Sequence, residues 1–230
     1  MPVLGNGDTP EIARLFKGKR PVYFRRKETV IRAGDEPQDI YFISKGFVRV
    51  YTVLENGRDL TLTVYGPGSY FPLIMAFSDM ESEYYYEALG EVGLFRIERK
   101  VLAEFVLQRP EVLLSLMKRT LLGLSGLLNN LELMFSGSAE NRVAGTIFLL
   151  AKRFGVKSKM GIVVKMPITH QEIASLSAIT RETASVVLKK MERDGLIAIR
   201  GKKLYVLDLA EIKKKLSLPA GEEKKPMAVV

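Results

Sequence analysis

Residues Pro110 to Phe135 have the sequence PEVLLSLMKRTLLGLSGLLNNLELMF, and this stretch decides the architecture of the chain. Apolar side chains recur in it at alternating steps of four and three residues, the spacing that forms the seam between paired helices. We predict one long helix that packs against the same helix of a second copy. The predicted seam comprises Leu113, Met117, Thr120, Leu124, Leu127, Leu131 and Met134.

Four further leucines widen the apolar face of this helix beyond a two-helix seam: Leu114, Leu121, Leu122 and Leu128. An ordinary amphipathic helix buried in its own domain therefore remains the alternative. We expect one side of the helix to pack on its own domain and the seam to face the second copy.

Net charge divides the chain at the end of this helix. Residues 1–136 carry 17 basic and 17 acidic side chains, whereas residues 137–230 carry 18 basic and nine acidic ones. The whole net charge of +9 therefore lies in the C-terminal part. A basic segment joined to a neutral one indicates a part that binds a polyanion and a part with another task. The length of 230 residues suits two domains.

Side-chain chemistry excludes several classes of protein. The chain has no cysteine, which excludes disulfides, thiolate zinc sites and cysteine-bound iron–sulfur clusters. His170 is the single histidine, so neither a cluster of imidazole ligands nor a histidine-based catalytic triad can form. We expect no metal, no catalytic residues and no enzyme activity. The sequence shows no apolar run of membrane-spanning length and no signal peptide, so we expect a cytoplasmic protein without a membrane partner.

Short β-rich segments separated by glycines follow one another between residues 21 and 98, at the rhythm of an antiparallel sandwich or roll. Asn56-Gly57 is the clearest hairpin turn. The stretch SYFPLIMAF, residues 69–77, is counted among the strands. A short helix from residue 100 to 105 precedes the long helix.

The C-terminal part has the pattern of a winged helix-turn-helix. A helix from Ser138 to Gly155 and a strand at 162–166 precede a helix that begins with the capping box Thr169-x-x-Glu172. A turn at 177–180, a second helix at 181–194 and a basic hairpin around residues 200–203 follow. A short helix capped by Asp208 ends this part, and residues 217–230 are predicted to be a disordered tail.

Residues 168–197, ITHQEIASLSAITRETASVVLKKMERDGLI, closely resemble the helix-turn-helix of bacterial transcription regulators of the cyclic AMP receptor protein and fumarate–nitrate reduction regulator (CRP/FNR) family. The order of the elements resembles that family over about residues 20–210. The resemblance implies an α+β chain: a cupin-like antiparallel β-roll of the cyclic-nucleotide-binding-domain type at 1–109, a long dimerisation helix at 110–136 and a winged helix-turn-helix at 137–216. It also implies a homodimer on palindromic double-stranded DNA and a contact with RNA polymerase.

The resemblance assigns base reading to Arg181 and Glu182, which suit guanine and cytosine edges respectively. Ser185 shares their helix face, and Val186 stands where the family often has a second arginine, so apolar contact with a thymine methyl group is expected there. Phosphate contacts are expected from Thr169, His170, Gln171, Thr180, Thr183, Lys189, Arg200 and Lys202.

The family commonly binds an effector between the roll and the long helix. The positions that hold the cyclic nucleotide's ribose and phosphate fall on Pro72 and Leu73 and near Ser82 and Glu83, so the required carboxylate and arginine are missing and cyclic AMP is not expected. Residues 1–169 lack histidine, which argues against haem. An apolar or aromatic ligand and a filled core without effector both remain open. The candidate pocket comprises Tyr70, Phe71, Pro72, Leu73, Ser82, Glu83, Tyr85, Leu127 and Leu128.

Two other classes of protein compete with this interpretation. One is a cupin-like enzyme with a basic accessory domain, against which the histidine-free roll argues. The other is a nucleic-acid-binding protein that recognises charge alone, which predicts equal and strongly salt-dependent binding to any duplex.

Overall fold

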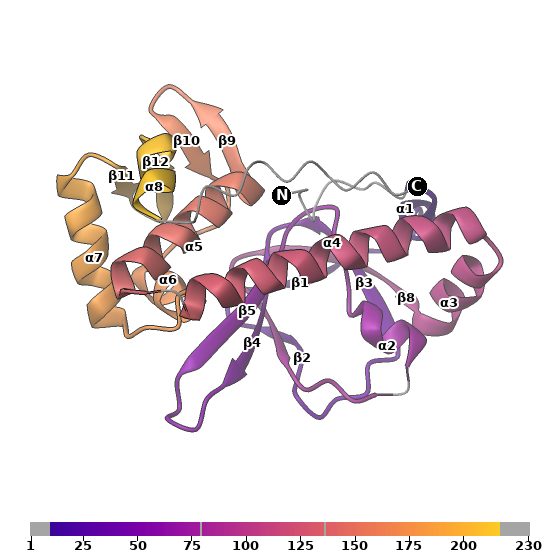
Figure 1. The fold of residues 1–230 in the computed structure, drawn as a ribbon. Coiled ribbons are helices and arrows are strands. Elements are labelled where there is room, and N and C mark those ends of the chain that lie inside the picture. The colour runs from indigo at the N-terminus through magenta and orange to yellow at the C-terminus, as the bar shows by residue number, and fades with distance from the viewer. Residues whose placement is uncertain (1–9, 79, 136, 217–230) are drawn as a thin grey trace.

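The computed structural model describes residues 10–78, 80–135 and 137–216 (Figure 1). Helix α1 (Pro10–Leu15) precedes a β-roll of two four-stranded antiparallel sheets, with strand orders β1-β8-β3-β6 and β2-β7-β4-β5. This confirms the predicted antiparallel roll. The strands are β1 (Val22–Phe24), β2 (Thr29–Ile31), β3 (Asp39–Lys45), β4 (Val48–Val53), β5 (Asp59–Tyr65), β6 (Tyr70–Phe71), β7 (Tyr85–Ala88) and β8 (Val92–Glu98).

Two glycines set the turns on either side of β4. Gly57 joins β4 to β5 with a φ of +75°, as the Asn56-Gly57 pattern predicts. Gly46 precedes β4 with a φ of +86°, and a Cβ there would lie 2.3 Å from the carbonyl oxygen of Glu91. Only glycine fits that approach of two backbones.

The strand predicted over residues 69–77 is confirmed only for Tyr70 and Phe71, and it is wrong for the rest of the stretch. Strand β6 ends at Phe71, and the short helix α2 (Leu73–Phe77) follows. Pro72 separates the two elements because it has no N–H group with which to continue the hydrogen-bond ladder.

Helix α3 (Arg99–Leu107) leads into α4 (Pro110–Phe135), which has the predicted bounds of the long helix. Among the described side chains of α4, only Val112 and Leu116 are buried, both near its start. Leu114, Leu121 and Leu128 are exposed, so they do not pack on their own domain as expected. The helix touches the roll mainly through its first turns and leaves a long apolar face uncovered.

The C-terminal part contains the predicted winged helix-turn-helix and one strand that the sequence pattern missed, β9. Its four-stranded sheet has the order β11-β12-β10-β9. The elements are α5 (Ala139–Phe154), β9 (Gly155–Ser158), β10 (Gly161–Val164), α6 (His170–Leu176), α7 (Arg181–Arg193), β11 (Ile197–Arg200), β12 (Lys203–Val206) and α8 (Leu209–Lys215). The tail predicted at 217–230 lies outside the described residues.

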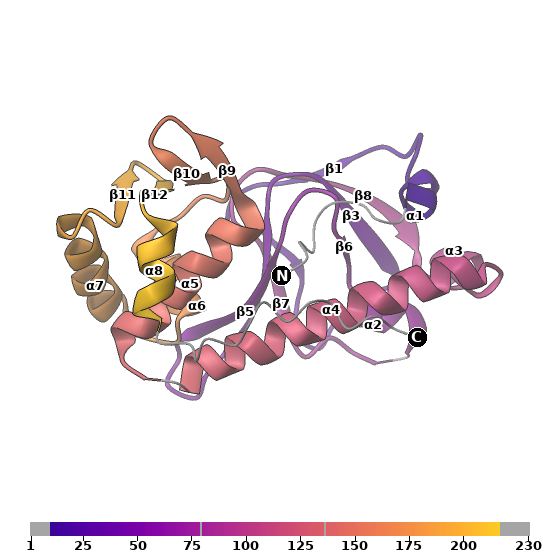
Figure 2. The ribbon, with the colours of Figure 1, turned by 45° about the horizontal axis from the view of Figure 1, so that its top comes forward.

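One hydrophobic cluster spans the two parts. Phe47, Val64 and Leu89 of the roll belong to the same buried cluster as the cores of α5, α6 and α7. Phe47 meets Phe154 edge to face at 5.3 Å, and a Cβ on Gly66 would crowd both rings. Figure 2 shows α4 running along the roll toward α5, with the C-terminal elements gathered at one end. No helix within the described ranges is long and apolar enough to cross a bilayer.

Candidate nucleic-acid interface and adjoining cavities

Side-chain caps position both helices of the helix-turn-helix. The Thr169 hydroxyl accepts a hydrogen bond from the Glu172 amide at the start of α6, and Thr180 accepts one from the Thr183 amide at the start of α7. Ala178 lies between the helices with a φ of +54°, in the left-handed region that allows the sharp turn. Local hydrogen bonds and one unusual backbone angle therefore fix the angle at which α7 leaves α6.

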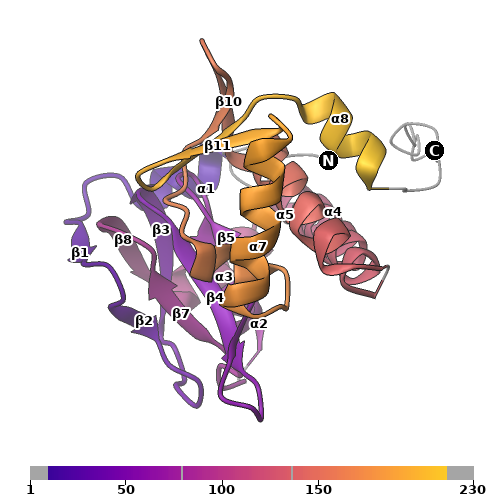
Figure 3. The ribbon, with the colours of Figure 1, turned by 90° about the vertical axis from the view of Figure 1, so that its left-hand side faces the viewer.

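Helix α7 lies on an outer flank of the molecule (Figure 3). Arg181, Glu182 and Val186 are exposed on it, and Val186 as a residue is 69% accessible. Its opposite face is buried through Ala184, Val187, Leu188 and Met191. The outer face of α7 therefore presents a polar first turn followed by one apolar residue, and a base contact by these side chains stays a prediction.

Ser185 is only partly exposed and its hydroxyl already has protein partners. It donates to the carbonyl oxygen of Arg181 at 2.8 Å and lies 2.8 Å from Nδ1 of His170. Because the single hydroxyl proton goes to Arg181, His170 is the donor in the second contact. His170 is therefore positioned against the start of α7, and a base contact by Ser185 stays a prediction.

The residues predicted to contact phosphates surround the recognition helix. Thr180 and Thr183 lie at its start, with their hydroxyl oxygens 2.9 Å apart. Arg200 and Lys202 are exposed at the tip of the hairpin formed by β11 and β12. Gln171, Thr180 and Lys189 are also exposed, whereas Thr169, His170 and Thr183 are half-buried.

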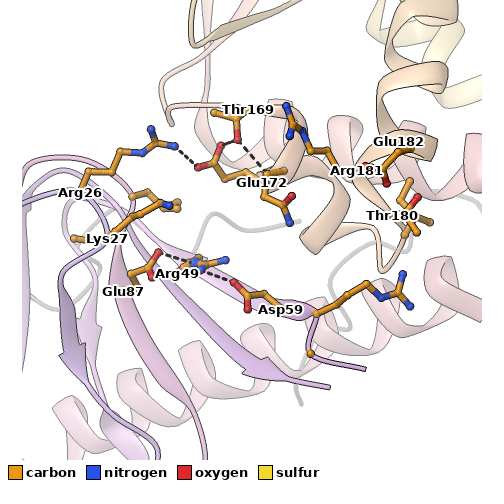
Figure 4. A pocket seen from close by; sticks show the side chains of 16 residues that line it. Arg26, Lys27, Arg49, Asp59, Glu87, Thr169, Glu172, Thr180, Arg181 and Glu182 are labelled. Atoms are coloured by element: carbon orange, nitrogen blue, oxygen red, sulfur yellow. Dashed lines mark hydrogen bonds and ion pairs between the residues drawn. The ribbon is translucent and has the colours of Figure 1, made fainter. Parts of the chain in front are cut away.

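A cleft of about 680 Å³ separates the start of α7 from the roll (Figure 4). Arg181 and Glu182 line one side, and Arg26, Lys27 and Arg58 line the other. No sequence pattern predicted a role for Arg26, Lys27 or Arg58, although the first two belong to a basic triplet, Arg25-Arg26-Lys27, in the N-terminal part, whose net charge is zero. They extend the positive surface beyond the helix-turn-helix.

One ion pair connects the two sides of this cleft, and others lie within the roll. Arg26 forms an ion pair with Glu172 across it, with Nη2 and Oε1 3.1 Å apart. Arg49 pairs with Asp59 at 2.7 Å and Glu87 at 3.0 Å within the roll, and these carboxylates raise the pKa of its guanidinium against the opposing effect of burial. Arg49 is therefore neutralised locally, whereas no carboxylate in the described ranges forms an ion pair with Lys27 or Arg58.

A second cavity, of about 440 Å³, lies between the second sheet, α4 and α5. Of the residues predicted for an effector pocket, Tyr70, Leu73 and Leu127 line it. The others do not: Phe71, Pro72, Ser82, Glu83, Tyr85 and Leu128 lie elsewhere, and Tyr86 takes the place expected of Tyr85.

The direction of each side chain explains these differences. Phe71 is fully buried in the roll and stacks on Tyr86 at 5.2 Å, so it is core. Tyr85 points to the other face of β7 and stacks on Tyr51. The Ser82 hydroxyl donates to the Tyr84 carbonyl within its own loop, and Glu83 is exposed. Leu128 is exposed beyond the cavity wall.

Both parts of the chain match known families. Residues 21–109 match the cyclic nucleotide-binding domain, and residues 141–215 match the Crp-like helix-turn-helix domain. Together these matches cover both the roll and the helix-turn-helix, in the order in which the structure has them.

Whole-length relatives agree with the domain matches. The transcriptional regulator LdrP of Thermus thermophilus is 31% identical over 192 residues, which cover 83% of this chain and 94% of that protein. The global nitrogen regulator of Synechococcus elongatus is 28% identical, over 88% of this chain and 94% of its own length. The crystal structure of a CRP-family transcriptional regulator from Thermus thermophilus superposes with a TM-score of 0.70 at 28% identity, covering 85% of this chain and 96% of that one.

Proposed function

Because this chain belongs to the CRP/FNR family of DNA-binding transcription regulators, we propose that two copies join through α4 and read a palindromic site with their α7 helices. Its relatives are regulators of transcription and not enzymes. The observation that carries the proposal is the combination of an exposed recognition face on α7 with an uncovered apolar face on α4.

The dimer is supported by the accessibility of the predicted seam. Leu113, Met117, Leu124, Leu127 and Leu131 are all exposed large apolar side chains in the single chain. An apolar strip of this length on one helix needs a cover, and the seam spacing fits a second identical helix. Thr120, Leu124 and Leu127 also line the cavity, so the second copy would lie beside it.

In the proposed complex, the two α7 helices enter successive major grooves about 34 Å apart. Arg181, Glu182, Ser185 and Val186 contact base edges. The predicted phosphate contacts hold the register: Thr169, His170, Gln171, Thr180, Thr183, Lys189, Arg200 and Lys202. Contact with RNA polymerase and a cytoplasmic location complete the proposal, both on the strength of family membership. An effector in the cavity would act through the distance between the two α7 helices.

A selection of bound sequences from random duplex DNA tests this proposal. We expect the full-length protein, at near-physiological salt, to recover a palindrome whose half-sites lie about one helical turn apart. At the base pair that faces Val186, the selected site should lack the preference for guanine that an arginine at this position would produce. Equal recovery of all sequences, with steep salt dependence, would instead show binding by charge alone.

A further inference from the structure

A hydrogen bond between His170 and Ser185 joins the two helices of the helix-turn-helix. His170 is the first residue of α6, and Ser185 lies one turn into α7. Nδ1 of His170 is 2.8 Å from the Ser185 hydroxyl oxygen, although the two residues lie 15 positions apart in the sequence. Ser185 belongs to the predicted base-reading face, and His170 belongs to the predicted phosphate contacts. The pair therefore connects the two kinds of predicted DNA contact.

The second hydrogen bond of Ser185 decides which ring nitrogen of His170 carries the hydrogen. The Ser185 hydroxyl donates to the carbonyl oxygen of Arg181 at 2.8 Å, so its single proton is used. Ser185 can only accept from His170, and Nδ1 must therefore carry the hydrogen. In a neutral imidazole the other nitrogen, Nε2, is then an acceptor without a hydrogen.

Nε2 is the ring nitrogen of His170 that remains for DNA. It forms no hydrogen bond with the described residues and is not among their buried atoms that lack a partner, so it is accessible to solvent. The lone pair of Nε2 in the neutral ring would repel a phosphate oxygen, which also presents only lone pairs. The imidazolium instead donates from both nitrogens. A contact between His170 and a phosphate therefore requires the charged ring.

The charged groups around α6 leave room for an added anion. Helix α6 packs against α7, β5 and α5. The acidic side chains of α6, β5 and α5 each have a cationic partner already: Glu172 with Arg26, Asp59 with Arg49 and Glu140 with Lys190. Within one turn of Ser185, α7 carries two cations and one acid, and a further cation lies in the hairpin that binds the Ile168 amide: Arg181, Lys189, Glu182 and Lys202. A phosphate at Nε2 would supply the anion that favours the doubly protonated ring.

We propose that His170 contacts a DNA phosphate as an imidazolium, so that each subunit takes up a proton when it binds duplex DNA. The contact contributes to affinity but carries no sequence information directly. Because proton uptake and DNA binding favour each other, the affinity for DNA rises as the pH falls through neutrality. The inference rests on the proposed function for its ligand, and it adds a proton to what that function requires.

The composition of the chain makes this proton uptake easy to isolate. His170 is the single histidine, and the chain has no cysteine. Imidazoles, perturbed thiols and the α-amino group are the groups that change charge between about pH 5 and pH 8. A proton taken up near neutral pH therefore goes to His170 or to the α-amino group, and substitution of His170 separates the two.

Calorimetry of the full-length protein with duplex DNA measures the protons directly. Binding enthalpies at neutral pH are compared in buffers of different ionisation enthalpy at one ionic strength, on the site recovered by selection and on an unrelated duplex. We expect the enthalpy to depend on the buffer with the sign of proton uptake. We also expect the affinity for either duplex to rise at least about ten-fold from about pH 8 to about pH 6. No dependence on the buffer, or equal affinity at both pH values, would overturn the proposal.

Substitutions at His170 connect the proton uptake to this ring. His170→Gln cannot titrate, so both the proton uptake and the pH dependence of affinity should disappear. His170→Arg is charged throughout this pH range and should bind DNA equally at both pH values. If His170→Gln keeps the pH dependence of the unmodified protein, the proton goes to another group and the inference is refuted.

A substitution at Ser185 tests the position of the hydrogen. Ser185→Ala removes the acceptor that holds the hydrogen on Nδ1, so the neutral ring can carry it on Nε2 and donate to a phosphate. The pH dependence should therefore shrink although the histidine remains. The matched control is Ser177→Ala, which removes a buried hydroxyl that contacts Thr146 and should keep the full pH dependence. Equal pH dependence in Ser185→Ala and Ser177→Ala would contradict the role of Ser185.

Nuclear magnetic resonance of the single imidazole, without DNA, separates this inference from the proposed function. We expect the neutral ring to carry its hydrogen on Nδ1, which the carbon and nitrogen chemical shifts of the ring report. A hydrogen on Nε2 would refute the inference whatever the protein binds. Proton uptake on every duplex, with no sequence preference, would refute the proposed function and leave the phosphate contact standing.

Discussion

Arg181 and Lys189 lie exposed on the same recognition helix, but they offer DNA different chemistry. The guanidinium of Arg181 carries two parallel donors that match O6 and N7 of guanine. The ammonium group of Lys189 is a compact charge that attracts any phosphate. Single residues therefore decide whether a contact contributes to sequence preference or only to affinity.

Replacing each residue with methionine separates these roles. Arg181→Met should lose about 1–3 kcal/mol of discrimination at one base pair of each half-site, because the paired donors are gone. Lys189→Met should weaken binding to all sequences and reduce the slope of log K against log salt by about one per subunit. Competition between the selected site and its single-base variants, over a range of salt, measures both effects. If Arg181→Met, like Lys189→Met, weakens binding to all sequences equally, Arg181 contacts a phosphate and not a base.

At the scale of elements, α4 differs from the other helices in how little of itself it buries. Two buried residues near its start hold it on the roll, and the rest of its described length has an exposed apolar seam. A helix of 26 residues with this seam is better suited to a partner helix than to solvent.

Lysines in the seam should separate the dimer. Leu124→Lys together with Leu131→Lys places two charges in the contact between the helices, so we expect a monomer by sedimentation velocity. The matched control, Ser125→Lys with Glu132→Lys, has two lysines at the same spacing outside the seam and should remain dimeric. A dimer in both variants would show that another surface holds the copies together.

At the scale of the whole molecule, a buried hydrogen-bond chain fastens the DNA-binding part to the roll. Ser175 of α6 donates to the Asp59 carbonyl of β5 at 2.9 Å, so the Thr61 hydroxyl donates to Ser175, 2.7 Å away. Thr61 and Ser175 are each 2% accessible. Thr61 and Ser175 lie 114 positions apart in the sequence, one in the roll and one in the C-terminal part, so this contact links the two parts directly.

Removing the Ser175 hydroxyl should loosen that link. Ser175→Ala leaves two buried groups without their partner, at a cost of about 1–3 kcal/mol in the free energy of unfolding. Hydrogen exchange should accelerate in both α6 and β5. The control is Ser177→Ala, because Ser177 makes a similar buried contact at 2.8 Å with Thr146 inside the C-terminal part. Ser177→Ala should accelerate hydrogen exchange in the C-terminal elements only. Faster hydrogen exchange in β5 of this control variant would refute the link.

The sequence by itself determined the elements whose causes are local. The bounds of α4, the cap of Ser138 on α5 and the Thr169–Glu172 capping box all depend on residues within a few positions of one another. The Asn56-Gly57 turn and the difference in net charge between the two parts could also be predicted from the sequence alone. These local signals were enough for the fold class and for the family resemblance that implied DNA binding.

Only the tertiary structure decided which distant side chains meet. Alternation along β7 shows only that Tyr85 and Tyr86 face opposite sides, whereas the packing of the two sheets decides that the side of Tyr86 lines the cavity and that Phe71 is buried in the core. Arg26 forms an ion pair with Glu172, which lies 146 positions later in the sequence, and Arg119 and Arg153 line one cavity because α5 lies beside α4. The spacing of residues along the sequence cannot predict such pairs, because they depend on how whole helices and strands are placed relative to one another.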